Sequence, residues 1–131
     1  MNGPALFNTV PRKDHLSLFK SGTGRPNYQK VVKLLDFKKK DVARASHLPV
    51  QSVRYDQKIP KELAERITEW AIALATVADY FQDSQKTMLW FRTANPLLGN
   101  VAPREMLRFG RFKKLHRFIL NALGENERDA A

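Results

Sequence analysis

The sequence predicts an all-α fold, because its apolar residues recur at the spacing of helices. In segments 27–36, 59–81 and 115–123, apolar side chains return every three or four residues. Proline and glycine residues lie between these segments, where helices are expected to begin or end. A chain of 131 residues with 43% hydrophobic content can form one domain, or two small ones that share a core.

The charge of the chain is positive and unevenly distributed. The formal net charge is +10. Residues 1–58 hold 12 Lys/Arg against 4 Asp/Glu, residues 59–87 hold 3 against 5, and residues 88–131 hold 8 against 4. A basic first part predicts a polyanionic partner such as nucleic acid.

Several classes of protein are disfavoured by composition. The chain has no cysteine, which excludes disulfides and thiolate metal sites and fits a reducing cytosol. No apolar run approaches the roughly 20 residues that a membrane span needs. The N-terminus lacks the layout of a signal peptide. We therefore expect a cytoplasmic protein with no membrane partner, associated with the nucleoid when DNA is bound.

No enzyme site is visible in the sequence. His15, His47 and His116 show no metal-ligand spacing, and the chain has no phosphate-binding glycine loop or nucleophile motif. We expect no catalytic residue, no metal and no cofactor.

Segment 1–26 reads as a flexible basic arm. It is rich in Gly and Pro and shows little periodicity. The helical pattern begins at Asn27 and runs to Asp36.

Segment 37–58 has the layout of a helix-turn-helix. The turn is expected at Ser46–Leu48, and Pro49 suits the start of the second helix. A left-handed backbone, which usually favours Gly, is common in this turn, and the chain has His47 there. An ordinary helical hairpin is the alternative. The expected core positions are Val42, Ala43, Leu48 and Val53.

A DNA interface follows if the second helix enters the major groove. Gln51 could then pair with adenine and Arg54 with guanine, while Tyr55 reaches a phosphate or packs inward. One copy makes few base contacts, so a homodimer on a near-palindromic promoter is expected. The candidate DNA-binding residues are Lys38, Lys39, Lys40, Gln51, Ser52, Arg54, Tyr55 and Lys58.

A long linking helix is predicted over Ile59–Phe81, where Pro60 suits its start. It completes a DNA-binding domain spanning 27–82. A polar break follows, with Ser84 as a cap for a helix that ends at Arg92.

The next stretch, Met88–Phe109, predicts a compact helix–loop–helix corner. Asn95 can cap a turn in which Pro96 takes the first position, and Gly99-Asn100 permits a positive φ. Pro103 then opens another helix. The expected core of the corner is Trp90, Leu97, Leu98 and Leu107.

The last predicted helix is amphipathic: the apolar residues of segment 115–123 form one stripe, and basic residues surround it. We expect Gly124 to end this helix and Glu125–Ala131 to form a polar tail. The helix-turn-helix core is expected not to depend on this last helix.

The corner resembles the C-terminal domain of Xre–MbcA–ParS-type antitoxins from bacterial toxin–antitoxin pairs. That family shows Trp-Leu, an Asn-containing turn, Leu-Gly-Gly, and Pro before a Leu-rich helix. This chain has Phe91 for the Leu and Asn100 for the second Gly. The resemblance covers Phe37–Glu125, and it is carried by Trp90, Phe91, Thr93, Asn95, Pro96, Leu98, Gly99, Pro103, Arg104, Glu105 and Leu107.

The resemblance implies an antitoxin that represses its own promoter and neutralises a toxin, commonly a RES-domain enzyme acting on NAD. It makes segment 83–131 a toxin-binding domain that covers the cleft of the toxin. Two alternatives are a stand-alone helix-turn-helix regulator with a C-terminal dimerisation domain, and an RNA-binding or architectural nucleoid protein. The candidate toxin-binding residues are Arg92, Arg104, Arg108, Arg111, Lys114, Arg117 and Asn121.

Overall fold

The computed structural model describes residues 14–20 and 23–130, and side chains up to residue 124. The described regular elements are all helical, which confirms the predicted all-α fold. They are, in order, α1 (Tyr28–Leu35), α2 (Lys39–Ala45), the 3-10 turn η2 (Val50–Ser52), α3 (Lys61–Phe81), α4 (Ser84–Arg92), the 3-10 turn η3 (Pro96–Leu98), α5 (Pro103–Arg108) and α6 (Phe112–Ala130).

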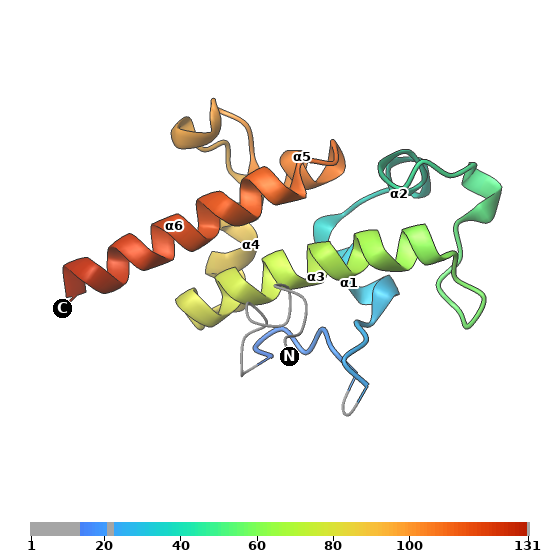
Figure 1. Cartoon of the computed structure of the whole chain (residues 1–131), viewed down its shortest axis with the longest axis horizontal. Coiled ribbons are helices and arrows are strands. Elements are labelled where there is room, and N and C mark those ends of the chain that lie inside the picture. The colour runs from blue at the N-terminus through green and yellow to red at the C-terminus, as the bar shows by residue number, and fades with distance from the viewer. Residues whose placement is uncertain (1–13, 21–22, 131) are drawn as a thin grey trace.

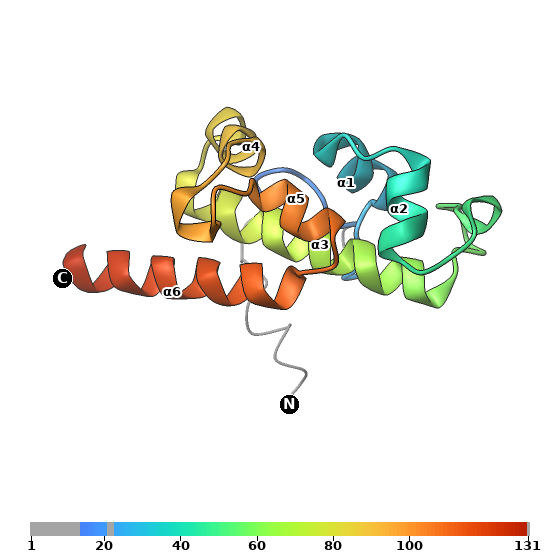
Figure 2. The same ribbon diagram turned by 90° about the horizontal axis from the view of Figure 1, so that it is seen from above.

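Helix α3 is the central element, as expected for the linking helix. Every residue of segment 70–78 is buried, and the helix packs against α1, α4 and α6 (Figure 1). Buried apolar residues from all six α-helices join one cluster. The expected segments 27–82 and 83–131 therefore share a core. In two perpendicular views α2 lies at one end of the long axis and α6 extends to the other (Figures 1 and 2).

The expectation of a flexible arm over 1–26 is wrong for residues 14–20. Asp14 accepts hydrogen bonds from the backbone N–H groups of Leu18 (2.8 Å) and Phe19 (2.7 Å). Leu16 and Leu18 are buried in the common core. His15 Nε2 lies 3.1 Å from Asp79 Oδ1 on α3. This segment is held because burying its leucines offsets the entropy of ordering it; residues 1–13 and 21–22 lie outside the described residues.

The first helix and the turn of the predicted helix-turn-helix have the expected geometry. Val42, Ala43 and Val53 are buried, and Leu48 is half-buried against the same core. His47 adopts the left-handed conformation with φ 57°. The turn is therefore closed by a residue that carries a Cβ in a region that L-residues disfavour.

The predicted second helix from Pro49 is wrong. One 3-10 turn, η2, stands in its place, and Val53 after it is extended with φ −75° and ψ 115°. Asp56 offers a competing set of hydrogen bonds: its carboxylate accepts from the Arg54 side chain and from the backbone N–H of Lys58. Such local side-chain bonds replace the i→i−4 ladder of a helix.

The corner after α4 folds largely as expected. The Asn95 side chain accepts a hydrogen bond of 2.9 Å from the Leu97 N–H, and Pro96 takes the first position of η3. Gly99 and Asn100 have φ 76° and 64°. The core assignment is only partly right: Leu107 is buried and Trp90 and Leu98 are half-buried, whereas the Leu97 residue is 79% exposed at the tip of the turn.

Helix α6 does not end at Gly124 as expected. Its backbone stays helical to Ala130, because Gly124 has no positive φ and good helix formers such as Glu and Arg follow it. Phe112, Leu115 and Ile119 on α6 are buried in the common core. Helix α6 therefore contributes to the common core, while the independence of the helix-turn-helix core from this helix stays a prediction.

Candidate functional site

Helix α2 presents a basic face at one end of the molecule. Lys38, Lys39 and Lys40 are exposed, as a phosphate-binding role requires. Two further residues of this surface were not predicted, because the sequence pattern placed the DNA contacts in the second helix. Arg44 and His47 are also exposed, and Arg44 lies one turn after Lys40 on the same helix.

The predicted base-reading residues lie on η2 and the loop after it, not along one face of an α-helix. Gln51 and Lys58 are exposed. Arg54 makes a two-point ion pair with Asp56, with distances of 2.7 Å from Nε and 2.5 Å from Nη2. Hydrogen bonding by Arg54 lowers the pKa of Asp56 below its ordinary value. Bidentate pairing of Arg54 with guanine would therefore require this ion pair to open.

Two further predicted DNA contacts, Ser52 and Tyr55, are half-buried. Tyr55 packs against the core, and burial raises the pKa of its phenol. Of the two roles open to Tyr55, the structure favours inward packing.

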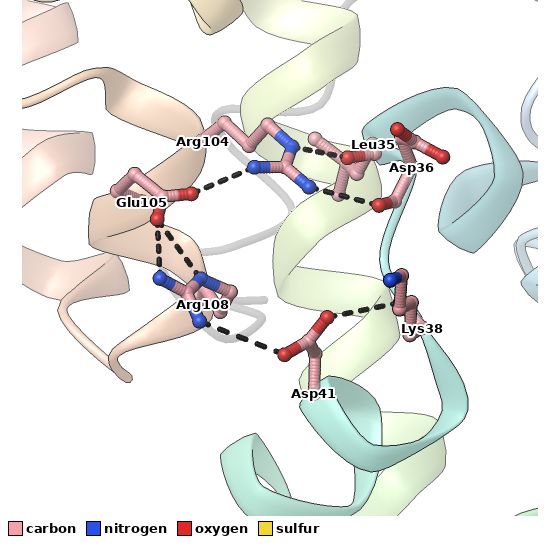
Figure 3. A network of polar contacts seen from close by, with 7 residues as sticks. All are labelled: Leu35, Asp36, Lys38, Asp41, Arg104, Glu105 and Arg108. Carbon is pink, nitrogen blue, oxygen red and sulfur yellow. Dashed lines mark hydrogen bonds and ion pairs between the residues drawn. The ribbon is translucent and has the colours of Figure 1, made fainter.

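Three predicted toxin contacts, Arg92, Arg104 and Arg108, make hydrogen bonds or ion pairs within the chain. Arg104 on α5 donates from Nε to the carbonyl of Leu35, and from Nη2 to the carbonyl of Asp36 at 2.8 Å (Figure 3). Its guanidinium also lies 5.0 Å from the centroid of the Phe37 ring. Arg92 at the end of α4 donates to the carbonyl of Leu34 at 3.1 Å.

Arg108 links α5 to α2 in the same network. It binds Glu105 through Nε at 3.0 Å and through Nη2, and its Nη1 lies 3.6 Å from Asp41 Oδ1 (Figure 3). Hydrogen bonding to Glu105 raises the pKa of Arg108 above its ordinary value, so the group stays charged. The arginines of α4 and α5 thus join the C-terminal half to the end of α1 and the start of α2. The sequence carries no signal for these contacts, because the partners are carbonyls and carboxylates far along the chain.

The other predicted toxin contacts face solvent on α6 or, for Arg111, directly before it. Arg111, Lys114, Arg117 and Asn121 are all exposed, and so is Lys113. This surface, which we call the α6 basic face, is defined by Arg111, Lys113, Lys114 and Arg117.

An apolar groove of about 320 Å³ lies between α3, the corner and α6. Tyr80 and Leu97, whose exposed fractions are 49% and 79%, line this groove. Apolar side chains open to solvent beside a charged face are a common arrangement of protein-binding surfaces. The groove is lined by Val77, Tyr80, Phe81, Trp90, Asn95, Leu97, Phe118, Ile119, Ala122 and Leu123.

Within residues 14–20 and 23–130, no group of three or more His, Asp or Glu side chains is placed to hold a metal ion. No helix in the same ranges is both long and apolar enough to cross a bilayer. Comparisons with protein-family models, with curated proteins and with solved structures found no match.

Proposed function

We propose that the chain is an antitoxin of a type II toxin–antitoxin pair, which binds its own promoter and neutralises a partner toxin. The observation that carries the proposal is that the chain exposes two basic surfaces on different helices. One is the face of α2, and the other is the α6 basic face with its adjoining groove. The resemblance of the corner to Xre–MbcA–ParS-type antitoxins supports the same function.

The DNA-binding part of the proposal rests on charge more than on base readout. Lys38, Lys39 and Lys40 are exposed together at the start of α2, where they can follow a phosphate backbone. Gln51 on η2 is the exposed side chain best suited to pair with a base edge. Because one copy offers so few base contacts, useful specificity requires a homodimer.

The toxin-binding part rests on the α6 basic face. Its four cations are exposed, and the apolar groove begins at Phe118, the residue after Arg117. A toxin with an acidic rim and an apolar anchor fits both features. By the resemblance, the toxin is a RES-domain enzyme that consumes NAD, and the chain itself has no catalytic activity.

Co-expression with the product of the neighbouring reading frame tests this function. When the chain is purified through an affinity tag, that product should be captured with it. The two proteins should then elute together in size-exclusion chromatography. The variant Arg111→Glu/Lys114→Glu should lose that product, whereas Lys39→Glu, a charge reversal on the other basic surface, should keep it. Retention by all variants would contradict the α6 basic face as the site, and no retention by the unaltered chain would contradict the antitoxin function.

The stand-alone regulator is the second candidate, and the apolar groove is the observation that favours it. A second copy of the chain covering the groove would make the C-terminal half a dimerisation surface. In that case the chain binds the promoter as a dimer but retains no neighbouring gene product.

A further inference from the structure

Asp41 is an acidic residue beside three lysines of the proposed DNA surface, Lys38, Lys39 and Lys40. It is the single acidic residue of α2, in the first turn directly after Lys39 and Lys40. Its Oδ2 accepts a 3.0 Å hydrogen bond from the backbone N–H of Lys38. Its side chain is 17% exposed, so its charge is not fully screened by water. A phosphate that meets these lysines therefore also meets a carboxylate that repels it.

Arg108 is the cation that faces this carboxylate from the opposite side. Its Nη1 lies 3.6 Å from Asp41 Oδ1, while Glu105 Oε1 holds the same guanidinium in place (Figure 3). Arg108 comes from α5, and its side chain is 28% exposed. A partly shielded pair at this distance interacts more strongly than an exposed surface pair.

Helix α2 is anchored at both ends by arginines from other helices. At its far end, Arg66 on α3 donates a 3.1 Å hydrogen bond to the carbonyl of Ala45. At its near end the anchor is Arg108 through Asp41. With seven residues, α2 has little stability of its own and depends on such contacts for its orientation.

We infer that Arg108 is a positioning residue for DNA binding: it balances the charge of Asp41 and fixes the start of α2 without touching DNA. The inference rests on the proposed DNA-binding function. It makes the C-terminal half of the chain part of the DNA-binding machinery, although α5 lies outside the face that meets the duplex.

The test is a double-mutant cycle on the full-length chain. The Kd of each protein for a labelled duplex of its own promoter is measured by fluorescence anisotropy. The four proteins are the unaltered chain, Arg108→Gln, Asp41→Asn and the double variant. Lys113→Gln is the matched control, since it removes one exposed cation from α6 with no contact to Asp41. Asparagine keeps an oxygen that can accept the Lys38 hydrogen bond.

Arg108→Gln should raise the Kd about threefold to tenfold beyond Lys113→Gln, the range expected for coupled neighbours. Asp41→Asn alone should lower the Kd, because it removes the repelling charge. The double variant should return to within about twofold of the unaltered chain. If Arg108→Gln does not fold, as judged by circular dichroism, the Kd of Asp41→Asn decides between support and rejection. A lower Kd than that of the unaltered chain supports the inference, and a higher one rejects it.

Two results would overturn the inference while the proposed function stands. In one, Lys39→Gln weakens binding but Arg108→Gln behaves like Lys113→Gln. In the other, Asp41→Asn weakens binding by itself, or fails to rescue Arg108→Gln, which is the outcome of a purely structural contact. If the unaltered chain does not bind the duplex, or Lys39→Gln binds as well as it does, DNA binding through α2 fails and the inference fails with it.

Discussion

Arg104 donates a hydrogen bond of 2.8 Å from Nη2 to the main-chain oxygen of Asp36, 68 residues earlier in the chain. This bond joins the corner of the C-terminal half to the end of α1. A second bond, from Arg104 Nε to the carbonyl of Leu35, serves the same helix end. Unpaired carbonyls at a helix C-terminus are stabilised by such cations.

Arg104→Ala should therefore lower the free energy of unfolding by about 1.5–3 kcal/mol, the range for hydrogen bonds to a charged group. Urea unfolding followed by circular dichroism measures this change. Lys113→Ala, at an exposed position on α6, should stay within about 0.5 kcal/mol. A change of that small size for Arg104→Ala would mean that the Arg104 hydrogen bonds add little to the stability of the fold.

His47→Gly tests the turn after α2. Because the exposed His47 has φ 57°, glycine should relieve backbone strain and raise stability by up to about 1 kcal/mol. Urea unfolding of the two proteins under identical conditions gives the difference. A clear loss of stability would show that the His47 side chain makes a stabilising contact that outweighs the strain.

The sequence predicted the helices better than it predicted what connects them. Periodicity placed α1 and α3. The polar break before α4 placed that helix, although its cap is Asp83 and not the expected Ser84. The helix predicted after Pro49 was wrong, because the spacing of apolar residues does not reveal the side-chain hydrogen bonds of Asp56. Periodicity also missed the burial of Leu16 and Leu18, which lie in a short apolar run among Gly and Pro.

For the candidate sites too, the sequence predicted which side chains are exposed but not which tertiary contacts they make. Exposure of the lysines and of the α6 basic face follows from the polar side of each helix, and the sequence identified both. The roles of Arg92, Arg104 and Arg108 depend on tertiary contacts with α1 and α2, which spacing along the chain cannot reveal.

Stability should fall in mild acid partly through His116. Burial lowers the pKa of His116 below its ordinary value of 6.5, and its Nε2 has no hydrogen-bond partner among the described residues. The unfolded chain then binds a proton below about pH 6.5 that the folded chain resists, so stability decreases as the pH falls through this value. His116→Asn should show a smaller loss of Tm between pH 7.5 and 5.5 than the unaltered chain. Equal losses would exclude His116 as a contributor.

Lys39→Ala and Gln51→Ala should weaken DNA binding in different ways. Lys39→Ala should reduce affinity for every duplex alike, and lower the slope of log K against log salt by about 0.9. Gln51→Ala should cost roughly 1–3 kcal/mol on the promoter and relax preference at one base pair. Anisotropy titrations at several salt concentrations, with promoter and scrambled duplexes, separate the two effects. If Gln51→Ala weakened binding to the promoter and scrambled duplexes alike, Gln51 would be a phosphate contact.

The most direct measurement of antitoxin function is rescue of growth. The product of the neighbouring reading frame is expressed from one promoter and the chain from another, with protein levels matched by immunoblot. We predict that the product alone arrests growth, and that the unaltered chain restores it. Arg111→Glu/Lys114→Glu should fail to restore growth while still shifting promoter DNA, because neither residue lies on α2. Absence of arrest, or full rescue by the double variant, would contradict neutralisation of a toxin through the α6 basic face.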